Sequence, residues 1–305
     1  MIHGVINIHK EKGYTSHDVV AKLRGIVGQK KIGHTGTLDP DATGVLPVCL
    51  GKATKLCDML TDKNKTYETV MLLGKVTDTQ DISGTVLREN PTDMLDEDSV
   101  KEAILSFVGD YMQVPPMYSA LKINGKKLYE LAREGVEVER EARLVTILNI
   151  EIKEINLPHV RMEVSCSKGT YIRTLCHDIG EKLGCGACMD ELIRTRVSRF
   201  NLEDSLTLSQ VQELKEAGEL EKILVPIDEM FSNYEAITLK EEYMSFVYNG
   251  NTFLPKHVKQ YIELMDGKMV RVYDDKGQFI AIYKFIKEKY IFKIEKMFYD
   301  RNEQA

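Results

Sequence analysis

The chain has 305 residues, of which 43% are hydrophobic and 29% are charged, a balance that is typical of a folded globular protein and excludes disordered, collagen-like and low-complexity chains. The 47 acidic residues outnumber the 41 Lys and Arg, giving a net charge of −6, so a uniformly basic surface for nucleic acid is excluded, although a local basic face is not. At about 150 residues per domain, two domains are expected.

The N-terminal segment and the overall hydropathy favour a cytoplasmic protein. No apolar run approaches the roughly 18 residues of a membrane span, and the first residues lack the basic start and long apolar stretch of a secretory signal. The six Cys are therefore expected to be reduced thiols.

Charge is distributed unevenly along the chain. The acidic excess lies in residues 61–110, with a net charge of −6, and in residues 201–250, with −8. Residues 1–60 and the last 55 residues each carry a net charge of +3. These two blocks are free to meet a polyanion, although solvated charged faces are the commoner explanation of such runs.

The first 200 residues mix strands and helices. The capping box Thr15-Ser16-His17-Asp18 predicts a helix that continues to Val27 and ends at Gly28. A later helix is predicted with Thr170 as its N-cap. Strands are expected at 5–8, 45–50, 67–73 and 160–166, and helical spacing covers 100–108 and 172–183. Because regular βαβ repetition is missing, the α+β class is favoured.

The pattern changes after residue 203. The acidic segment 203–235 is interpreted as a helix and linker. Four short strand-like runs follow, separated by turn residues, at 261–265, 269–273, 279–285 and 290–296. We expect a small all-β module there.

The common sequence motifs for binding cofactors and metals are incomplete in this chain. Gly51-Lys52-Ala53 resembles the end of a phosphate-binding loop, but Ala53 stands where Ser or Thr is needed. Cys185 and Cys188 form a CxxC without a second pair, and His177 nearby does not complete a convincing zinc site. We expect no metal and no cofactor.

The segment 33–44, Gly-His-Thr-Gly-Thr-Leu-Asp-Pro-Asp-Ala-Thr-Gly, gathers polar groups on a flexible backbone. A tight turn with Asx caps is the structural alternative. The segment resembles the signature of the TruB family of tRNA pseudouridine synthases, which the dyskerin-type relatives share. The resemblance runs from about residue 1 to 232 through further motifs, in the expected order, at 65–68, 77–81, 113–122 with 125–135, 167–174 and 178–184.

The resemblance implies a fold and a division of the chain. The fold is a mixed, largely antiparallel sheet flanked by helices. Residues 1–232 would form the catalytic domain, with an inserted segment at about 111–145 that grips RNA. Residues 233–305 resemble, less distinctively, a reduced PUA domain, which is an RNA-binding β module.

The family reaction breaks the uracil–ribose C–N bond and makes a C–C bond at C5, and the resemblance assigns three catalytic residues. Asp39 is the carboxylate that acts as nucleophile or stabilises the ribose cation, and because an aspartate ordinarily has a pKa of about 3.9, it is ionised without a helper base. Asp41 is the alternative, but its position varies in the family motif. Arg173 would pair with Asp39, and Tyr67 would stack under the target uracil and help to remove the C5 proton.

Four further residues match family positions that bind the substrate. They are His34, Lys55, Tyr171 and Leu192. The segment 193–198 departs from the commoner family pattern of paired arginines and a glycine. That departure concerns detailed RNA contacts and leaves the chemistry in place.

The sequence thus predicts a cytoplasmic, monomeric enzyme that converts uridine 55 in the T arm of tRNA to pseudouridine. The base is flipped, and neither a guide RNA nor a protein partner is required. Two alternatives stay open. One is a guide-RNA-dependent synthase of the dyskerin type, and the other is a tRNA-folding chaperone with secondary catalysis.

Overall fold

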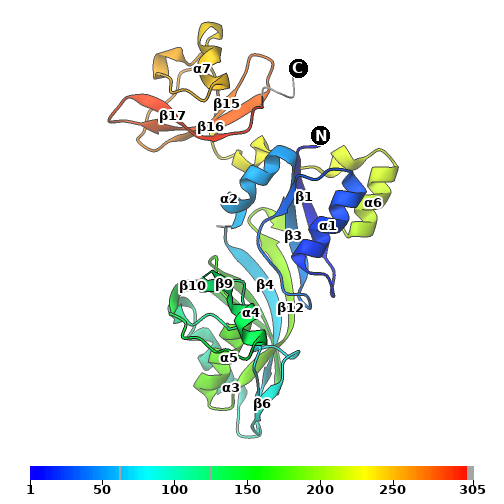
Figure 1. Cartoon of the computed structure of the whole chain (residues 1–305). Helices are drawn as coiled ribbons and strands as arrows, with labels where there is room; N and C mark the ends of the chain where they lie inside the picture. The colour runs from blue at the N-terminus through cyan, green and yellow to red at the C-terminus, as the bar shows by residue number, and fades with distance from the viewer. Residues whose placement is uncertain (62, 124, 301–305) are drawn as a thin grey trace.

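The main sheet carries most of the chain (Figure 1). The computed structural model describes residues 1–61, 63–123 and 125–300. Nine strands form one sheet in the order β1-β3-β12-β4-β11-β10-β7, with β2 paired to β3 and β13 to β12. Their bounds are β1 Gly4–Lys10, β2 Ile32–His34, β3 Thr43–Leu50, β4 Lys65–Leu73, β7 Gly109–Gln113, β10 Arg143–Asn156, β11 His159–Cys166, β12 Ala187–Val197 and β13 Phe200–Asn201. All of these pairs are antiparallel except β3 with β12. The predicted α+β class with a largely antiparallel mixed sheet is confirmed.

Two groups of helices cover this sheet. Helices α1 (Ser16–Val27) and α6 (Leu208–Glu216) pack over β1 and β3. Helices α3 (Glu97–Leu105) and α5 (Ile172–Leu183) pack over the part formed by β4, β10, β11 and β12. The capping box at Thr15 and the left-handed C-cap Gly28 of α1 are present as predicted. No helix in the described ranges has the length and apolar character needed to cross a membrane.

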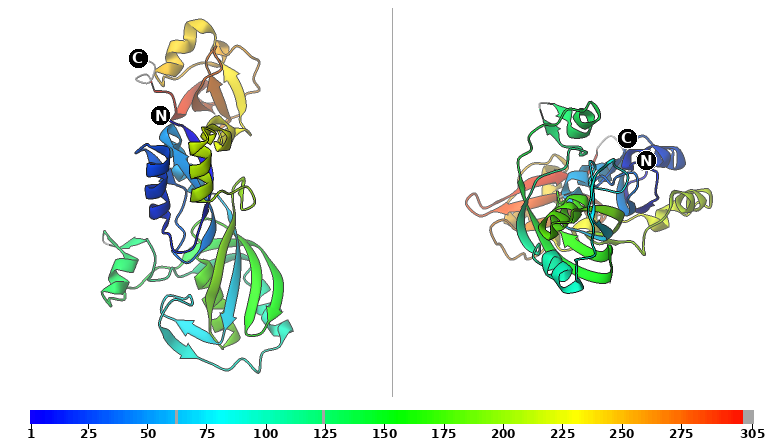
Figure 2. Two further views of the ribbon diagram at one scale, coloured as in Figure 1. Left: turned by 90° about the vertical axis from the view of Figure 1, so that its right-hand side faces the viewer. Right: turned by 90° about the horizontal axis from the view of Figure 1, so that it is seen from below.

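Short elements fill the connections. They are η1 (Gly51–Leu56), α2 (Cys57–Thr61), the hairpin of β5 (Lys75–Thr77) and β6 (Val86–Glu89), η2 (Leu220–Ile223) and η3 (Asp228–Phe231). The predicted insertion carries the hairpin of β8 (Lys122–Ile123) and β9 (Lys126–Lys127) followed by α4 (Leu128–Arg133). Figure 2 shows this arm standing away from the main sheet. Asn124 in the arm and residues 301–305 lie outside the described residues.

The C-terminal module has its own four-stranded sheet, in the order β14-β15-β16-β17. The strands are β14 (Glu235–Thr238), β15 (Met269–Tyr273), β16 (Phe279–Ile286) and β17 (Ile291–Met297), accompanied by η4 (Glu241–Tyr243), α7 (Met244–Tyr248) and η5 (Pro255–His257). The strand expected at 261–265 is wrong, because that segment is irregular. The fourth strand is instead β14, which pairs in parallel with β15.

An apolar cluster joins the C-terminal module to the rest of the molecule. Ile282 and Phe298 from the module are buried with Val5, Leu56 and Phe231. The module lies at one end of an elongated molecule (Figure 1). The two sheets have separate cores, but this shared cluster holds them together. The division into domains at 232/233 stays a prediction.

Candidate active site

The signature loop connects β2 to β3, and β12 closes it from the side. Ile193 and Arg194 of β12 pair in parallel with Thr43 and Gly44. Gly44 has a φ of +103°, and a Cβ there would lie 2.3 Å from the Arg194 carbonyl oxygen. Only glycine fits this close approach. The strand that closes the loop is about 150 residues further along the chain.

Two side chains from the N-terminal segment hold the loop. Lys10 is fully buried, and its Nζ donates hydrogen bonds to the carbonyl oxygens of Pro40 at 3.0 Å and Ala42 at 2.5 Å. Burial lowers the pKa of Lys10 to about 8, against the opposing effect of nearby carboxylates. The backbone N–H of Leu38 donates to Ser16 Oγ at 2.9 Å. Sequence reasoning missed both Lys10 and Ser16, because nothing in their local pattern marks a partner some 20 to 30 residues away.

Arg173 and Asp39 are brought together. Arg173 Nη2 lies 3.3 Å from Asp39 Oδ2, and its side chain is 6% exposed against 42% for the carboxylate. The same guanidinium donates to the Tyr118 carbonyl oxygen at 2.6 Å and lies 3.7 Å from Asp81 Oδ2. A buried guanidinium thus anchors a carboxylate that faces solvent and fixes its direction.

The start of α5 is fixed by the root of the insertion. The Gln113 side chain accepts from the Tyr171 N–H at 2.8 Å and donates to the Tyr171 carbonyl oxygen at 3.0 Å. Tyr171, and not the expected Thr170, is the N-cap residue of α5. Thr170 Oγ1 donates instead to the Ser167 carbonyl oxygen at 3.0 Å. The Arg173 guanidinium lies 5.9 Å from the centre of the Tyr171 ring.

Tyr67 lies on β4 and packs with residues of the signature loop. It is 8% exposed and belongs to the same apolar cluster as Leu38 and Ala42. Burial raises the pKa of Tyr67, and the neighbouring Arg194 guanidinium opposes that rise. Leu192, two residues before Arg194 on β12, packs partly buried against this cluster. Tyr67, Leu192 and Asp39 therefore belong to one region.

Of the other two predicted substrate-binding residues, His34 lies at the start of the signature loop and Lys55 lies away from Asp39. His34 ends β2, and its ring meets His17 edge-on at 5.3 Å. Burial lowers the pKa of His34, and its Nδ1 has no hydrogen-bond partner among the described residues. Lys55 in η1 does not join the Asp39 region, because its Nζ donates to the Met297 carbonyl oxygen of β17 at 2.7 Å.

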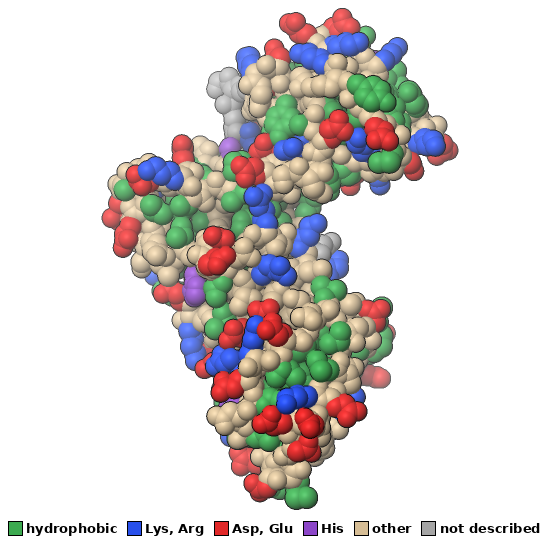
Figure 3. Space-filling view, turned by 180° about the vertical axis from the view of Figure 1, so that it is seen from behind, with side chains coloured by type: hydrophobic (Ala, Val, Ile, Leu, Met, Phe, Trp, Pro, Cys, Tyr) green, Lys and Arg blue, Asp and Glu red, His purple; other side chains and the backbone are tan. Residues whose placement is uncertain are grey.

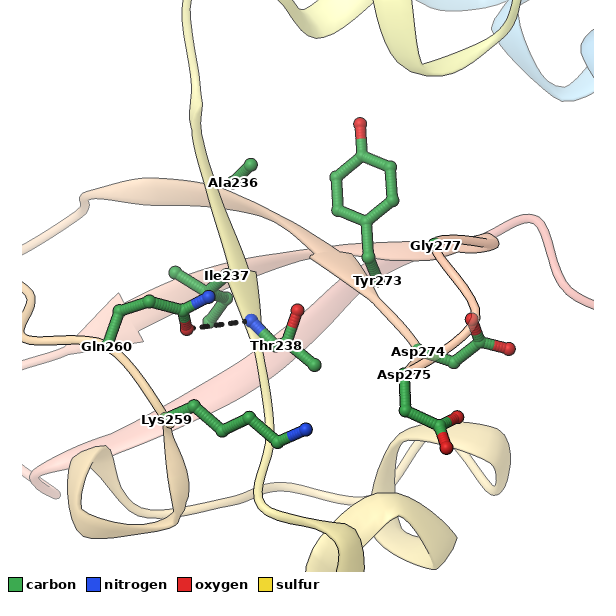
Figure 4. A pocket seen from close by; sticks show the side chains of 9 residues that line it. All are labelled: Ala236, Ile237, Thr238, Lys259, Gln260, Tyr273, Asp274, Asp275 and Gly277. Atoms are coloured by element: carbon green, nitrogen blue, oxygen red, sulfur yellow. Dashed lines mark hydrogen bonds between the residues drawn. The ribbon is translucent and has the colours of Figure 1, made fainter.

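A hollow lies far from this region, in the C-terminal module. A cavity of about 500 Å³ is found between β14 and the end of β15, with Lys259, Gln260 and Asp275 along its wall (Figure 4). The buried Asp274 carboxylate beside it accepts from the N–H groups of Lys276 and Gln278, so it caps the β15–β16 turn. In residues 1–61, 63–123 and 125–300, no group of three or more His, Cys, Asp or Glu side chains is arranged to hold a metal ion.

Basic side chains line a notch in the molecular surface. The space-filling view shows a deep notch between the C-terminal module and the rest of the molecule, with Lys and Arg side chains along its inner side (Figure 3). A notch of this kind offers a rim of positive charge to a polyanion.

Family models match most of the chain. Residues 24–172 match the model described as "TruB family pseudouridylate synthase (N terminal domain)". Residues 173–232 match the one described as "tRNA pseudouridylate synthase B C-terminal domain". The boundary between the two matches falls at Arg173, at the start of α5.

Relatives and solved structures agree with these matches. The chain is 50% identical to the tRNA pseudouridine synthase B of Lachnoclostridium phytofermentans, covering 97% of this chain and 100% of the relative. It is 48% identical to that of Alkaliphilus oremlandii, covering 90% and 91%. The structure is similar to "Crystal Structure of a Cbf5-Nop10-Gar1 Complex", with a TM-score of 0.73 and 30% identity, covering 98% of this chain and 86% of that one. It is also similar to "Structure of H/ACA RNP bound to a substrate RNA containing 2'-deoxyuridine", with a TM-score of 0.72, 27% identity and the same two coverages.

Proposed function

The chain belongs to the TruB family of tRNA pseudouridine synthases, and from this premise we propose that it converts uridine 55 in the T arm of tRNA to pseudouridine without a guide RNA. The observation that carries the proposal is the contact of 3.3 Å between Arg173 and Asp39 in the signature loop. The reaction is an isomerisation, so every atom of the uridine is retained.

Asp39 supplies the carboxylate that the C–N cleavage needs. The C1′–N1 bond breaks, the uracil turns within the site, and C1′ bonds to C5. The carboxylate serves equally in attack at C6, in attack at C1′, or in a route through a glycal, because each needs an anionic oxygen at the ribose or the base. Arg173 aims that oxygen through a contact of 3.3 Å from its buried guanidinium.

Tyr67 is proposed to lie under the flipped uracil. Flipping a stacked base costs a few kcal/mol, and aromatic stacking returns roughly 1–3 kcal/mol per base. The side chain of Leu192 packs on the same cluster and would border the base. His34 and Tyr171, which flank the loop and Arg173, complete the proposed pocket.

Phosphate contacts supply the remaining binding energy. On the arm, Lys122 and Lys126 are exposed and face the RNA in this proposal. The C-terminal module holds RNA beyond the T arm as a PUA-like domain. Lys55 stands at the junction of the module with the catalytic part, so its proposed contact with RNA is at the backbone and not at the reacting base. We propose a cytoplasmic monomer that needs no protein partner, metal or cofactor.

A guide-dependent synthase is the second candidate, and one observation favours it. The likeness to the Cbf5 complex covers 98% of this chain. Against it stand the relatives at 45–50% identity that cover nearly the whole chain and are named for tRNA. The chaperone candidate is compatible with catalysis, since both need the same bound RNA.

The test uses the purified chain and an unmodified tRNA transcript. After incubation, carbodiimide labelling and primer extension map pseudouridine at each position. We expect a single new stop at position 55 with no other RNA or protein present. Modification that appears only when a guide RNA is added would support the guide-dependent candidate and overturn the proposal.

A further inference from the structure

Gln113 is a buried polar side chain at the end of β7, and the proposed chemistry has not yet used it. Only 1% of its surface is exposed, and burying an amide costs free energy unless its hydrogen bonds are made. Oε1 accepts from the Tyr171 N–H at 2.8 Å, whereas Nε2 donates to the Tyr171 carbonyl oxygen at 3.0 Å and also to the Tyr111 phenol oxygen. The amide therefore binds both main-chain groups of one residue, and it fits in one orientation only.

The residue bound in this way begins the helix that carries Arg173. Tyr171 is the N-cap of α5, and its carbonyl oxygen also accepts the first helical bond, from the Leu175 N–H at 3.0 Å. Helices α1, α3 and α6 each have an N-cap side chain that accepts from the first turn. Among the described residues, the Tyr171 side chain makes no such bond. The start of α5 is therefore fixed from outside the helix, by a strand.

The partners of the Arg173 guanidinium lie in irregular segments. Nη2 lies 3.3 Å from the Asp39 carboxylate and donates to the Tyr118 carbonyl oxygen at 2.6 Å. Neither Asp39 nor Tyr118 belongs to a helix or strand. Nε of Arg173 has no hydrogen-bond partner among the described residues, and Asp81 lies further away, at 3.7 Å. The main chain of Arg173, two residues after Tyr171, is thus the part that regular structure fixes.

Gln113 is a firm point of attachment for that main chain. It is in register with Arg143 of β10, so it belongs to the main sheet. The residues that follow it, Pro115, Pro116 and Met117, are buried. The root of the insertion is therefore packed, although the arm beyond it stands away from the sheet (Figure 2). The contact of Gln113 with Tyr171 consequently joins α5 to the sheet and not to the arm.

We propose that Gln113 is a positioning residue for the isomerisation: its two hydrogen bonds to Tyr171 fix the start of α5 and so keep Arg173 in contact with Asp39. This inference rests on the proposed function. The amide forms no bond with the substrate and transfers no proton, so it acts on the rate through Arg173. A misplacement of about 1 Å near a reacting group can slow a reaction by roughly a hundred-fold.

The test separates the chemical step from RNA binding. Single-turnover pseudouridine formation at saturating tRNA gives the rate, filter binding gives the Kd, and thermal melts check folding. Gln113→Met keeps the length of the side chain but removes both bonds to Tyr171. Gln113→Asn keeps the amide on a side chain one methylene shorter, which no longer reaches both groups. It serves as the second variant if Gln113→Met does not fold.

The chain offers a matched control in Gln29. Its Oε1 accepts from the Ile2 N–H at 2.9 Å, and its Nε2 donates to the Ile2 carbonyl oxygen at 3.1 Å. This is the same pair of bonds to one residue, but Ile2 packs on the apolar cluster of α1 and β1 and not on the one that contains Tyr67. Gln29→Met therefore reports what the loss of such a contact does away from Arg173.

The Gln113 variants should slow the chemical step by about ten- to a hundred-fold and leave the Kd within about three-fold of the native value. Gln29→Met should change neither quantity by more than about three-fold. Arg173→Lys provides a second background, in which the slow reaction is followed over long incubations. In that background Gln113→Met should cost less than about three-fold more, because the two changes remove one function.

Three results would overturn the inference. The first is a native rate in a folded Gln113 variant. The second is a loss confined to the Kd, which would assign Gln113 to the grip of the insertion on RNA. The third is a full further loss in the Arg173→Lys background, which would show that Gln113 acts independently of Arg173. In each case the native chain still makes pseudouridine, and the proposed function fails only if the native chain leaves uridine 55 unchanged.

Discussion

At the scale of single residues, the site places a solvent-facing carboxylate on a buried guanidinium. Asp39 has 42% of its side chain exposed, whereas Arg173 beneath it has 6%. In the proposed reaction the substrate would meet the anion, and the cation that orients it is already buried in the free protein. The orientation of Asp39 is thus prepared by the fold and need not be established by RNA binding.

Asp39→Asn should abolish turnover while tRNA binding is kept. The amide retains the size of the side chain but loses the charge and nucleophilicity on which the C–N cleavage depends. Single-turnover pseudouridine formation and a filter-binding Kd measure the two effects. Asp41→Asn is the control, since Asp41 is exposed two residues away and should change the rate by less than about ten-fold. A comparable rate in Asp39→Asn would remove Asp39 from the mechanism.

The sequence pattern marks some residues of the candidate site and misses others that contact it, for a physical reason. Asp39, Tyr67 and Arg173 stand in the family motifs. Lys10 and Arg194 carry no such mark, because each acts on backbone carbonyls that are remote in sequence. From sequence alone, a lysine at the end of an apolar strand is expected to face solvent, and so is an arginine within a strand. Only the positions of the partner strands show that both are buried.

At the scale of elements, local signals predict best. The capping box of α1 depends only on residues 15–18, and it forms as expected. The strand expected at 261–265 fails because alternation alone does not supply a partner strand. The strand that pairs with β15 is instead β14, which begins at Glu235. Its first residue belongs to the acidic segment 203–235, for which the sequence predicts a helix and linker. Pairing across 30 residues is a tertiary property that short-range pattern does not encode.

Helix α5 carries a carboxyl that opposes folding at neutral pH. Burial, assisted by Glu181, raises the pKa of Asp178 to about 6 from its ordinary value of 3.8. Since the folded state then binds more protons between these two values, stability falls as pH rises through that window, and the full cost is present above about pH 6.

Asp178→Asn should therefore stabilise the protein at pH 7.5. The side chain is partly exposed, so the gain is about 1–2 kcal/mol after allowance for solvent screening. It should shrink as pH falls toward 4, because the native carboxyl is then protonated in the folded state and increasingly so in the unfolded state. Thermal melts of both proteins across this range measure the difference. A gain that is independent of pH would assign the effect to hydrogen bonding and not to charge.

At the scale of the whole molecule, the C-terminal module stabilises the catalytic part, because an apolar cluster joins the two sheets. Phe298 and Ile282 of the module are buried in one apolar cluster with Val5 and Leu56 of the catalytic part. The main-chain oxygen of Met297 also receives Lys55. Removing the module uncovers this apolar surface and frees that lysine.

Ending the chain after Asn233 should leave a folded but less stable enzyme that binds tRNA more weakly. No proposed catalytic group lies beyond residue 194, so the chemical step at saturating tRNA should persist. The dependence of Kd on salt should become shallower, because fewer phosphates are neutralised. Melts, salt titrations and single-turnover assays provide the readouts, and a salt slope equal to that of the full chain would show that the module does not hold RNA.

The parallel pairing of β3 with β12 has a consequence for protein synthesis. The loop carrying Asp39 is made early, but the strand that closes it ends at Val197. At about 5–20 residues per second, a ribosome needs roughly 8–30 s to make the residues between them. During that time Gly44 lacks its neighbour and Tyr67 lacks Arg194. Under the proposed function, a nascent chain would make no pseudouridine until nearly two-thirds of it has been synthesised, and a ribosome that stalls earlier would release only inactive fragments.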